Sequence, residues 1–98
     1  MAGYEHLTVE RSGATVTITM RRPAKRNALS TPHLEELLRA FTETAQTDAT
    51  GVILAGEGPV FSAGHDFAEV ASLDTDGVRQ LLDLCTRLMT TLHTVPQV

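Results

Sequence analysis

Polar and apolar residues alternate in the first part of the chain, which is the pattern of half-buried β-strands. Leu7 and Val9 alternate with polar residues, and the stretch 14–20 (ATVTITM) alternates apolar residues with threonine. Ser12 and Gly13 separate the two runs, and this pair suits a tight turn. The pattern therefore predicts a β-hairpin.

A helical period replaces the alternation after residue 30. Apolar residues recur three or four positions apart in a set that comprises Leu34, Leu37, Leu38, Phe41 and Ala45. This spacing predicts an amphipathic helix that ends near Gln46. We expect Thr31 to cap the helix and Pro32 to occupy its first position, where the missing N–H group has no intrahelical partner to lose.

A short apolar run bounded by glycines follows at 51–56 (GVILAG). Its length favours a strand that is buried on both faces. The strand at 14–20, the helix and this apolar strand together form a βαβ unit. We therefore expect the two strands to be parallel.

Two further helices are predicted in the last third of the chain. A short one begins at His65 or Asp66, and a long one begins near Asp74, which can cap it. The long helix carries an apolar stripe that comprises Val78, Leu81, Leu82, Cys85, Leu88, Met89 and Leu92. Pro96 follows this helix, and a proline in that position usually precedes another element. The order of elements predicts an α/β fold.

Composition and charge narrow the class of protein. The chain has 98 residues, enough for one domain, with 42% apolar and 20% charged residues. The formal net charge of −4 includes no block of like charge, which gives no support for a nucleic-acid or membrane-surface partner. The single cysteine, Cys85, excludes an internal disulfide, and no signal peptide or apolar run of about 18 residues is present. We expect a cytoplasmic protein.

The usual signatures of metal, nucleotide and nucleophile sites are missing from the sequence. The four histidines, His6, His33, His65 and His93, lie far apart and show no metal-ligand spacing, so we expect no metal. The stretch 56–64 (GEGPVFSAG) lacks the endings typical of a phosphate-binding or dinucleotide-binding loop. No G-x-S-x-G elbow is present, so a structural role is expected for Ser62.

The loop that ends at Gly64 is the best candidate for a binding site. It follows the carboxyl end of a buried parallel strand, where open α/β sheets place their ligands. Gly64 allows the backbone to approach a ligand closely. If a helix begins at His65, the N–H of that residue is free to face developing negative charge on an oxygen. The alternative is a capped turn in which Gly64 supplies only a special backbone angle.

Two segments together resemble the enoyl-CoA hydratase/isomerase (crotonase) superfamily. They are RPAKRNALS at 22–30 and GEGPVFSAGHDFAEV at 56–70, which combine P-x-x-x-N-A-L with F-S-A-G-x-D. The resemblance covers nearly the whole chain. It implies that residues 1–98 form the amino-terminal portion of the α/β crotonase-like (ClpP/crotonase) fold. The implied portion ends before the strand and glycine-rich segment that follow in the family.

The resemblance also implies a set of site residues. The first loop would lie along coenzyme A and comprises Lys25, Arg26, Asn27, Ala28 and Leu29. Lys25 or Arg26 suits a phosphate, although a solvated basic loop is the alternative. The backbone that would line the acyl-CoA thioester comprises Ala63, Gly64, His65, Asp66 and Phe67. The N–H of His65 would be one donor of an oxyanion hole, and Asp66 would cap the next helix or hold the loop.

The implied chemistry is stabilisation of a thioester enolate by two backbone N–H groups. The expected reaction is hydration of a 2-enoyl-CoA in fatty acid metabolism, with an isomerase or a thioester hydrolase as alternatives. Coenzyme A enters as the substrate thioester, and no permanently bound cofactor is expected. The second donor and the acidic residues lie beyond Pro96 in the family, so we expect this chain alone to be inactive. A full-length relative would form a homo-oligomer, a trimer or hexamer.

Two other interpretations stay open. In the first, the chain is a non-catalytic fragment or subunit that needs a partner. This interpretation expects an apolar stripe to be poorly covered at Leu81, Leu82, Leu88 and Leu92, which would favour association. In the second, the chain is an unrelated small α/β binding module.

Overall fold

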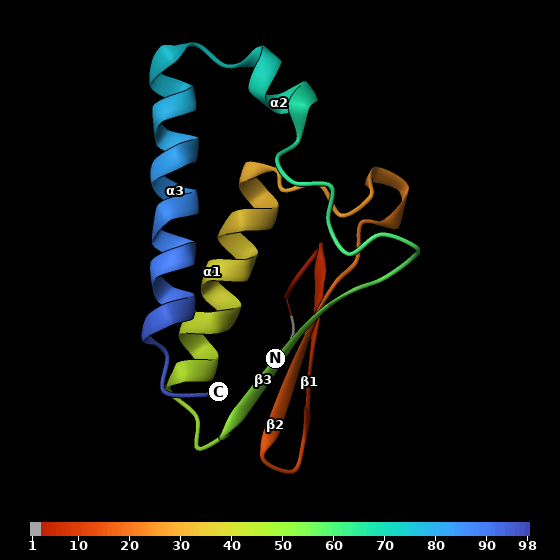
Figure 1. The fold of residues 1–98 in the computed structure, drawn as a ribbon, viewed down its shortest axis with the longest axis vertical. Helices are drawn as coiled ribbons and strands as arrows, with labels where there is room; N and C mark the ends of the chain where they lie inside the picture. Colours follow the sequence, from red (N-terminus) through yellow and green to blue (C-terminus); the bar gives the residue numbers. More distant parts are fainter. Residues whose placement is uncertain (1–2) are drawn as a thin grey trace.

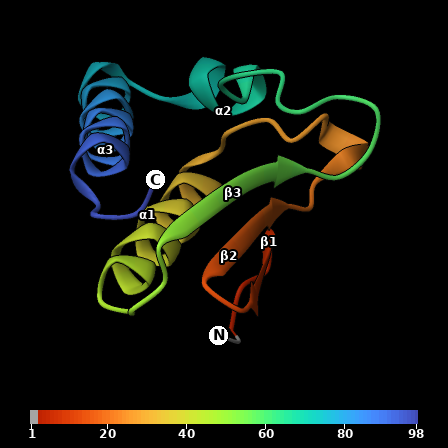
Figure 2. The same ribbon diagram turned by 60° about the horizontal axis from the view of Figure 1, so that its bottom comes forward.

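Three strands form one sheet, and the helices lie on one side of it (Figures 1 and 2). A computed structural model describes residues 3–98. The elements in chain order are β1 (Leu7–Ser12), β2 (Thr15–Met20), a 3-10 helix η1 (Pro23–Lys25), α1 (Thr31–Ala45), β3 (Gly51–Gly56), α2 (Phe67–Ser72) and α3 (Thr75–Thr94). The strand order is β1-β2-β3, with an antiparallel β1–β2 pair and a parallel β2–β3 pair, which confirms the expected α/β arrangement.

The hairpin of β1 and β2 supplies the buried face of the sheet. Val16, Ile18 and Met20 are buried, while the threonines between them remain partly exposed, as the alternation predicts. The predicted turn is one residue off, because Ser12 pairs with Thr15 in the ladder. The turn therefore consists of Gly13 and the residue after it. Gly13 has φ +59°, an angle that favours glycine.

Helix α1 begins at Thr31 and not at Pro32, so both its start and its cap lie one residue earlier than predicted. Ser30 has an extended backbone, and its Oγ accepts a hydrogen bond from the N–H of His33 at 3.4 Å. Thr31 is already helical, so the prediction of Thr31 as the N-cap is wrong. Pro32 lies in the first turn, where its missing N–H leaves no bond unmade. Leu34, with the other apolar residues of its stripe, faces the sheet and α3.

Strand β3 pairs in register with β2, with Ile18 opposite Leu54. The expectation that both its faces are buried is wrong in the part of the chain that the structure describes. Val52 and Leu54 face α1 and are partly buried, whereas Ile53 points the other way and is 53% exposed. The difference arises because the described helices cover only one face of the sheet (Figure 2).

The last two helices have aspartate caps. Asp66 accepts from the N–H of Glu69 at 3.2 Å, so α2 begins at Phe67, slightly later than predicted. Asp74 caps α3 as expected, since it accepts from the N–H of Gly77 at 2.8 Å. Within residues 3–98, no helix combines the length and apolar character needed to cross a membrane.

Helix α3 packs on α1, and this contact corrects the expectation of a poorly covered stripe. Leu81 and Leu88 are each only 3% exposed, because they lie against α1. Leu82 is 52% exposed and Leu92 is partly buried. The expected exposure is therefore wrong for the residues that face α1. It is right for Leu82, which lies on another face of α3.

His33 is a polar residue in the core of the helix–sheet interface. It is fully buried, and its Nδ1 lies 3.1 Å from the carbonyl oxygen of Ala28. A carbonyl only accepts, so Nδ1 carries the proton, and Nε2 has no partner among residues 3–98. Burial lowers the pKa of His33 below its ordinary value of 6.5, because the imidazolium loses its hydration. The nearby charges of His6 and Arg22 act in the same direction.

We predict that the protein loses stability as the pH falls below about 6.5. The folded chain has the lower pKa at His33, so the unfolded chain binds more protons in this window and the free energy of unfolding rises with pH. His33→Gln should remove the increase of the unfolding free energy with pH that His33 contributes. Urea unfolding at several pH values between about 5.5 and 7.5 measures this increase. Identical slopes for the variant and the original chain would contradict the assignment.

Candidate functional site

The loop after β2 and the loop after β3 pair with each other at one end of the sheet. The N–H of Leu29 donates to the carbonyl of Gly64 at 2.7 Å, and the N–H of Asp66 donates to the carbonyl of Leu29 at 3.3 Å. These bonds make an isolated parallel bridge between Leu29 and His65. The structure thus brings together the two segments that the sequence analysis singled out.

Asn27 is the buried link between these loops. Its side chain is fully buried, and its Nδ2 donates to the carbonyls of Glu57 at 2.9 Å and Val60 at 3.0 Å. Its Oδ1 accepts from the N–H of Arg22 at 2.8 Å. Asn27 has φ +53°, and asparagine tolerates this left-handed conformation better than most residues. The amide of Asn27 is therefore committed to holding the loops.

Ser62 joins Asn27 to Gly64, the residue before His65. Its hydroxyl donates to the carbonyl of Asn27 at 2.9 Å and accepts from the N–H of Gly64 at 3.2 Å. Gly64 has φ +89°, and a Cβ built there would meet no atom within 4 Å. The position therefore requires glycine for its backbone angle and not for lack of space.

The N–H of His65 is left free by this arrangement. In the bridge, the carbonyl of Gly64 and the N–H of Asp66 both bond to Leu29. In an extended chain, the backbone N–H and carbonyl groups of successive residues point to opposite sides. The N–H of His65 therefore points away from Leu29, and no group within residues 3–98 accepts from it. Because α2 begins at Phe67, this N–H is free through strand-like pairing and not as part of a helix terminus.

One ion pair and several hydrogen bonds hold the N-terminal ends of α1 and α2 beside the loops. The guanidinium of Arg22 donates to the carbonyl of Ala28 at 2.8 Å and lies 3.6 Å from the carboxylate of Asp66. The carboxylate of Glu69 accepts from the N–H of Thr31 at 2.9 Å and from its hydroxyl at 2.9 Å. The sequence analysis missed Arg22 and Glu69, because no spacing rule joins Thr31 to a residue 38 positions away.

The other predicted site residues lie on or near the surface of these loops. Lys25 and Arg26 are exposed, and neither belongs to the ion pairs found within residues 3–98. Ala63 is exposed, and its N–H donates to the carbonyl of Arg26 at 2.9 Å. Phe67 is 80% exposed at the start of α2, and Leu29 is partly buried. The two free cations can meet an anion from solvent.

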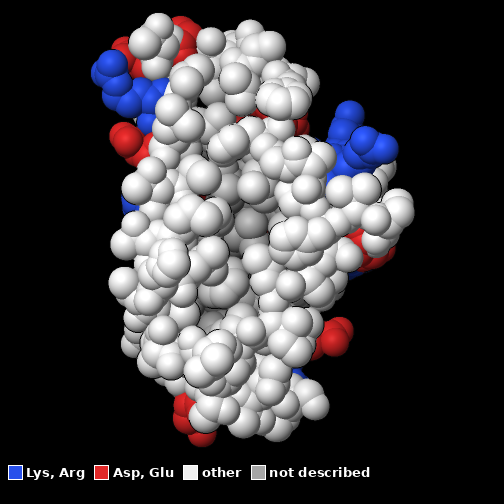
Figure 3. Space-filling view, in the orientation of Figure 1, with Lys and Arg blue, Asp and Glu red and all other residues white. Residues whose placement is uncertain are grey.

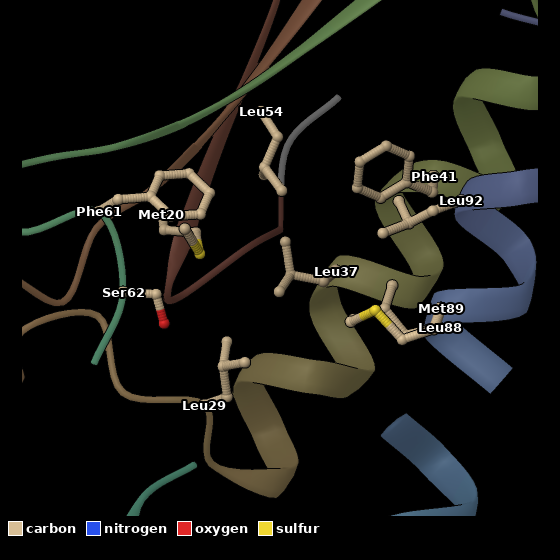
Figure 4. A pocket seen from close by; sticks show the side chains of 10 residues that line it. All are labelled: Met20, Leu29, Leu37, Phe41, Leu54, Phe61, Ser62, Leu88, Met89 and Leu92. Carbon is tan, nitrogen blue, oxygen red and sulfur yellow. The ribbon is translucent and has the colours of Figure 1, made fainter. Parts of the chain in front are cut away.

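An apolar cavity of about 100 Å³ lies beside the loop after β3 (Figure 4). It is lined by Met20, Leu29, Leu37, Phe41, Leu54, Phe61, Ser62, Leu88, Met89 and Leu92. The lining holds no titratable group, so the cavity offers no acid–base chemistry and suits only an apolar occupant. On the face drawn in Figure 3, a hollow runs among uncharged residues, while charged side chains lie at the periphery.

A trio of potential metal ligands lies away from these loops. Ligand atoms of Glu5, His6 and Glu36 lie within 4.8 Å of one another. Glu36 already accepts from the backbone N–H groups of Glu5 and His6 at 2.9 Å each. The sequence analysis did not anticipate this grouping, since Glu36 lies 30 positions from His6. These bonds explain the grouping without a metal, because the carboxylate of Glu36 accepts from the backbone N–H groups that precede β1.

The fold and the loops define an α/β protein that presents a fixed, free backbone donor beyond the carboxyl end of a parallel strand. A sequence model described as enoyl-CoA hydratase/isomerase matches residues 10–98. The chain therefore belongs to the enoyl-CoA hydratase/isomerase family.

Several known proteins support this assignment. The chain is 44% identical over 66 residues to 4-chlorobenzoyl coenzyme A dehalogenase-2 of Arthrobacter sp, covering 66% of this chain and 24% of that protein. It is 35% identical over 89 residues to enoyl-CoA hydratase domain-containing protein 3, mitochondrial, of Danio rerio, covering 89% and 31%. The crystal structure of enoyl-CoA hydratase from Mycobacterium smegmatis superimposes with TM-score 0.90 at 33% identity, covering 95% and 37%. The chain thus spans less than two fifths of these relatives.

We predict that Asn27→Gly lowers the free energy of unfolding by about 1–3 kcal/mol. Glycine accepts the left-handed backbone angle, so the loss reports the side-chain bonds and not backbone strain. Urea unfolding measures the loss, and hydrogen exchange at the amide of Leu29 should become faster because its bond to Gly64 crosses the two loops. Ser62→Ala, which removes one hydroxyl and leaves Asn27 in place, should have a smaller effect. Unchanged exchange at Leu29 in Asn27→Gly would contradict the linking role.

Proposed function

We propose that this chain is the acyl-CoA-binding portion of an enzyme that stabilises a thioester enolate, with the backbone N–H of His65 as one donor of the oxyanion hole. The observation that carries the proposal is the fixed and unbonded N–H of His65, which follows Gly64 in a loop beyond β3. Membership of the enoyl-CoA hydratase/isomerase family supports the choice of substrate class.

The chemistry follows from where charge develops. Removal of a proton next to a thioester, or addition to its conjugated double bond, moves negative charge onto the thioester oxygen. A preorganised N–H then binds the oxygen more strongly in the transition state than in the substrate. The links through Asn27 and Ser62 keep the donor in place before the substrate arrives, so little reorganisation is needed during the reaction.

The side chains of the chain itself do not complete this chemistry. Glu69 is held by Thr31, and Glu57 lies 3.3 Å from Arg21 in an exposed ion pair. We therefore assign the second oxyanion donor and the acid–base groups to another part of a complete enzyme, and we propose that this chain alone is inactive. Hydration of a 2-enoyl-CoA is the proposed reaction. The alternatives are isomerisation, which shares the enolate, and thioester hydrolysis, in which the same N–H would face the oxyanion of a tetrahedral intermediate.

The proposal has consequences for the substrate and the assembly. Coenzyme A would enter as the substrate thioester with no permanent cofactor, and Lys25 and Arg26 would meet its phosphates. The complete enzyme would act in the cytoplasm as a homo-oligomer, a trimer or hexamer, by its resemblance to the family.

We predict that Gly64→Val abolishes detectable binding of crotonyl-CoA in isothermal titration calorimetry. A β-branched residue is strained at φ +89°, so the loop would rearrange and displace the N–H of His65. Gly13→Val is the matched control, because Gly13 also has a positive φ and open space around its Cβ but lies in the hairpin turn. The control should be destabilised and should still bind. Equal binding by the two variants would count against the assigned loop.

Lys25→Ala and Arg26→Ala should each weaken crotonyl-CoA binding by roughly threefold to tenfold, because each removes an exposed cation from a phosphate. The loss should shrink as salt is added, since salt screens exposed charges. Neither substitution should change binding of the crotonyl thioester of pantetheine, which lacks the nucleotide phosphates. Arg11→Ala is the control, because Arg11 is paired with Asp48 on the hairpin. An equal loss for both thioesters would contradict the phosphate assignment.

A further inference from the structure

The guanidinium of Arg22 contacts both loops of the candidate site. Its Nη1 donates to the carbonyl of Ala28 at 2.8 Å and to the hydroxyl of Ser30 at 3.0 Å. These two bonds to the first loop flank Leu29, the residue that forms the bridge. Its Nη2 lies 3.6 Å from the carboxylate of Asp66 in the second loop. Arg22 therefore contacts both neighbours of Leu29 and also reaches across to the other loop.

Leu29 and Asp66 set the direction of the proposed donor. The N–H of Leu29 donates to the carbonyl of Gly64, and that carbonyl shares a planar peptide unit with the N–H of His65. The two groups of a trans peptide point in opposite directions, so this bond turns the N–H of His65 away from Leu29. The N–H of Asp66 donates to the carbonyl of Leu29 and fixes the other side of His65. Movement of either Leu29 or Asp66 would therefore redirect the donor.

The ion pair between Arg22 and Asp66 is sheltered from water. Their side chains are only 16% and 19% exposed, whereas those of the pair between Arg21 and Glu57 are 52% and 51% exposed. An exposed pair holds its partners weakly, because water and salt screen the charges and the side chains stay mobile. A sheltered carboxylate depends more on its cation, since it has given up part of its hydration. The ion pair can thus hold Asp66 in one place.

Capping of α2 does not account for this ion pair. The carboxylate of Asp66 accepts from the N–H of Glu69 at 3.2 Å, and a cap of this kind needs no cation. Asp74 caps α3 in the same way at 2.8 Å, and no ion pair within residues 3–98 includes it. The two caps therefore differ in one respect, because Asp66 alone is also tied to the opposite loop.

We propose that Arg22 is a positioning residue for the oxyanion donor. It acts on one side of the bridge through the residues that flank Leu29 and on the other side through Asp66. The N–H of His65 then already has the direction that meets a thioester oxygen, so the donor needs no ordering during the reaction. The inference rests on the proposed function for what the donor binds, and on the free chain for how the donor is held.

Two substitutions break the ion pair in different ways. Asp66→Asn keeps a good cap residue of nearly the same shape and loses the charge, while Arg22→Met keeps an unbranched apolar stem. In the free chain, NMR relaxation should show a more mobile N–H at His65 in both variants, and hydrogen exchange at Leu29 should become faster. The double variant should match Arg22→Met, because the two residues act through one interaction. Asp74→Asn is the matched control and should leave His65 unchanged.

The complex with butyryl-CoA, isotope-labelled at its thioester carbonyl carbon, provides a second measurement. A hydrogen bond to the thioester oxygen moves the carbonyl resonance downfield. This shift should shrink in Asp66→Asn and Arg22→Met, and binding should weaken by roughly fivefold, the effect of one poorly made hydrogen bond. Asp74→Asn should bind butyryl-CoA with the same affinity and the same shift as the original chain.

The two measurements separate this inference from the acyl-CoA proposal. If the original chain leaves the carbonyl resonance unmoved while the variants loosen the N–H of His65, the acyl-CoA proposal fails and the positioning role stands. The positioning role is overturned if Asp66→Asn and Arg22→Met lower the free energy of unfolding and leave the mobility of His65 unchanged. It is also overturned if Asp74→Asn loosens His65 equally. Asp66→Asn decides the question even if Arg22→Met does not fold, because it changes so little of the side chain.

Discussion

The side-chain amide of Asn27 makes the hydrogen bonds on which the proposed site depends. It joins the backbone of the loop after β2 to the backbone of the loop after β3, and it does so while fully buried. Backbone bonds from Leu29 to Gly64 and from Ala63 to Arg26 join the same two loops at their surface. With Asn27 in place, the bridge between Leu29 and His65 forms, and one backbone N–H is directed away from the protein's own acceptors. Structural bonds thus fix the position of the proposed oxyanion donor.

In the proposed site, the chemical role belongs to the backbone and not to the side chains. The carboxylate of Asp66, next to His65 in the sequence, caps α2 and pairs with Arg22. The group assigned to the chemistry is the peptide N–H of His65, whose position depends on the angle that Gly64 permits. A backbone donor held in this way has no side-chain freedom to lose, which suits it to stabilising charge in a transition state.

Sequence patterns predict the elements well and the contacts between loops poorly. The threonine alternation of β2 and the glycine-bounded run of β3 predict the two strands, because a strand depends on local periodicity. The helix between them predicts their parallel pairing. The cap of α1 shifts by one residue because Ser30 and Thr31 are both good caps, and the backbone angle decides between them. The bond between Glu69 and Thr31 joins residues 38 positions apart, so no local rule could predict it.

The central claim is that the N–H of His65 binds the thioester oxygen of an acyl-CoA. A crystal structure of the protein with a bound unreactive analogue, such as butyryl-CoA, tests it most directly. The account predicts the thioester oxygen at about 2.7–3.1 Å from the nitrogen of His65, with the links through Asn27 and Ser62 unchanged. A thioester bound elsewhere, or an N–H of His65 that bonds to the protein in the complex, would contradict the account.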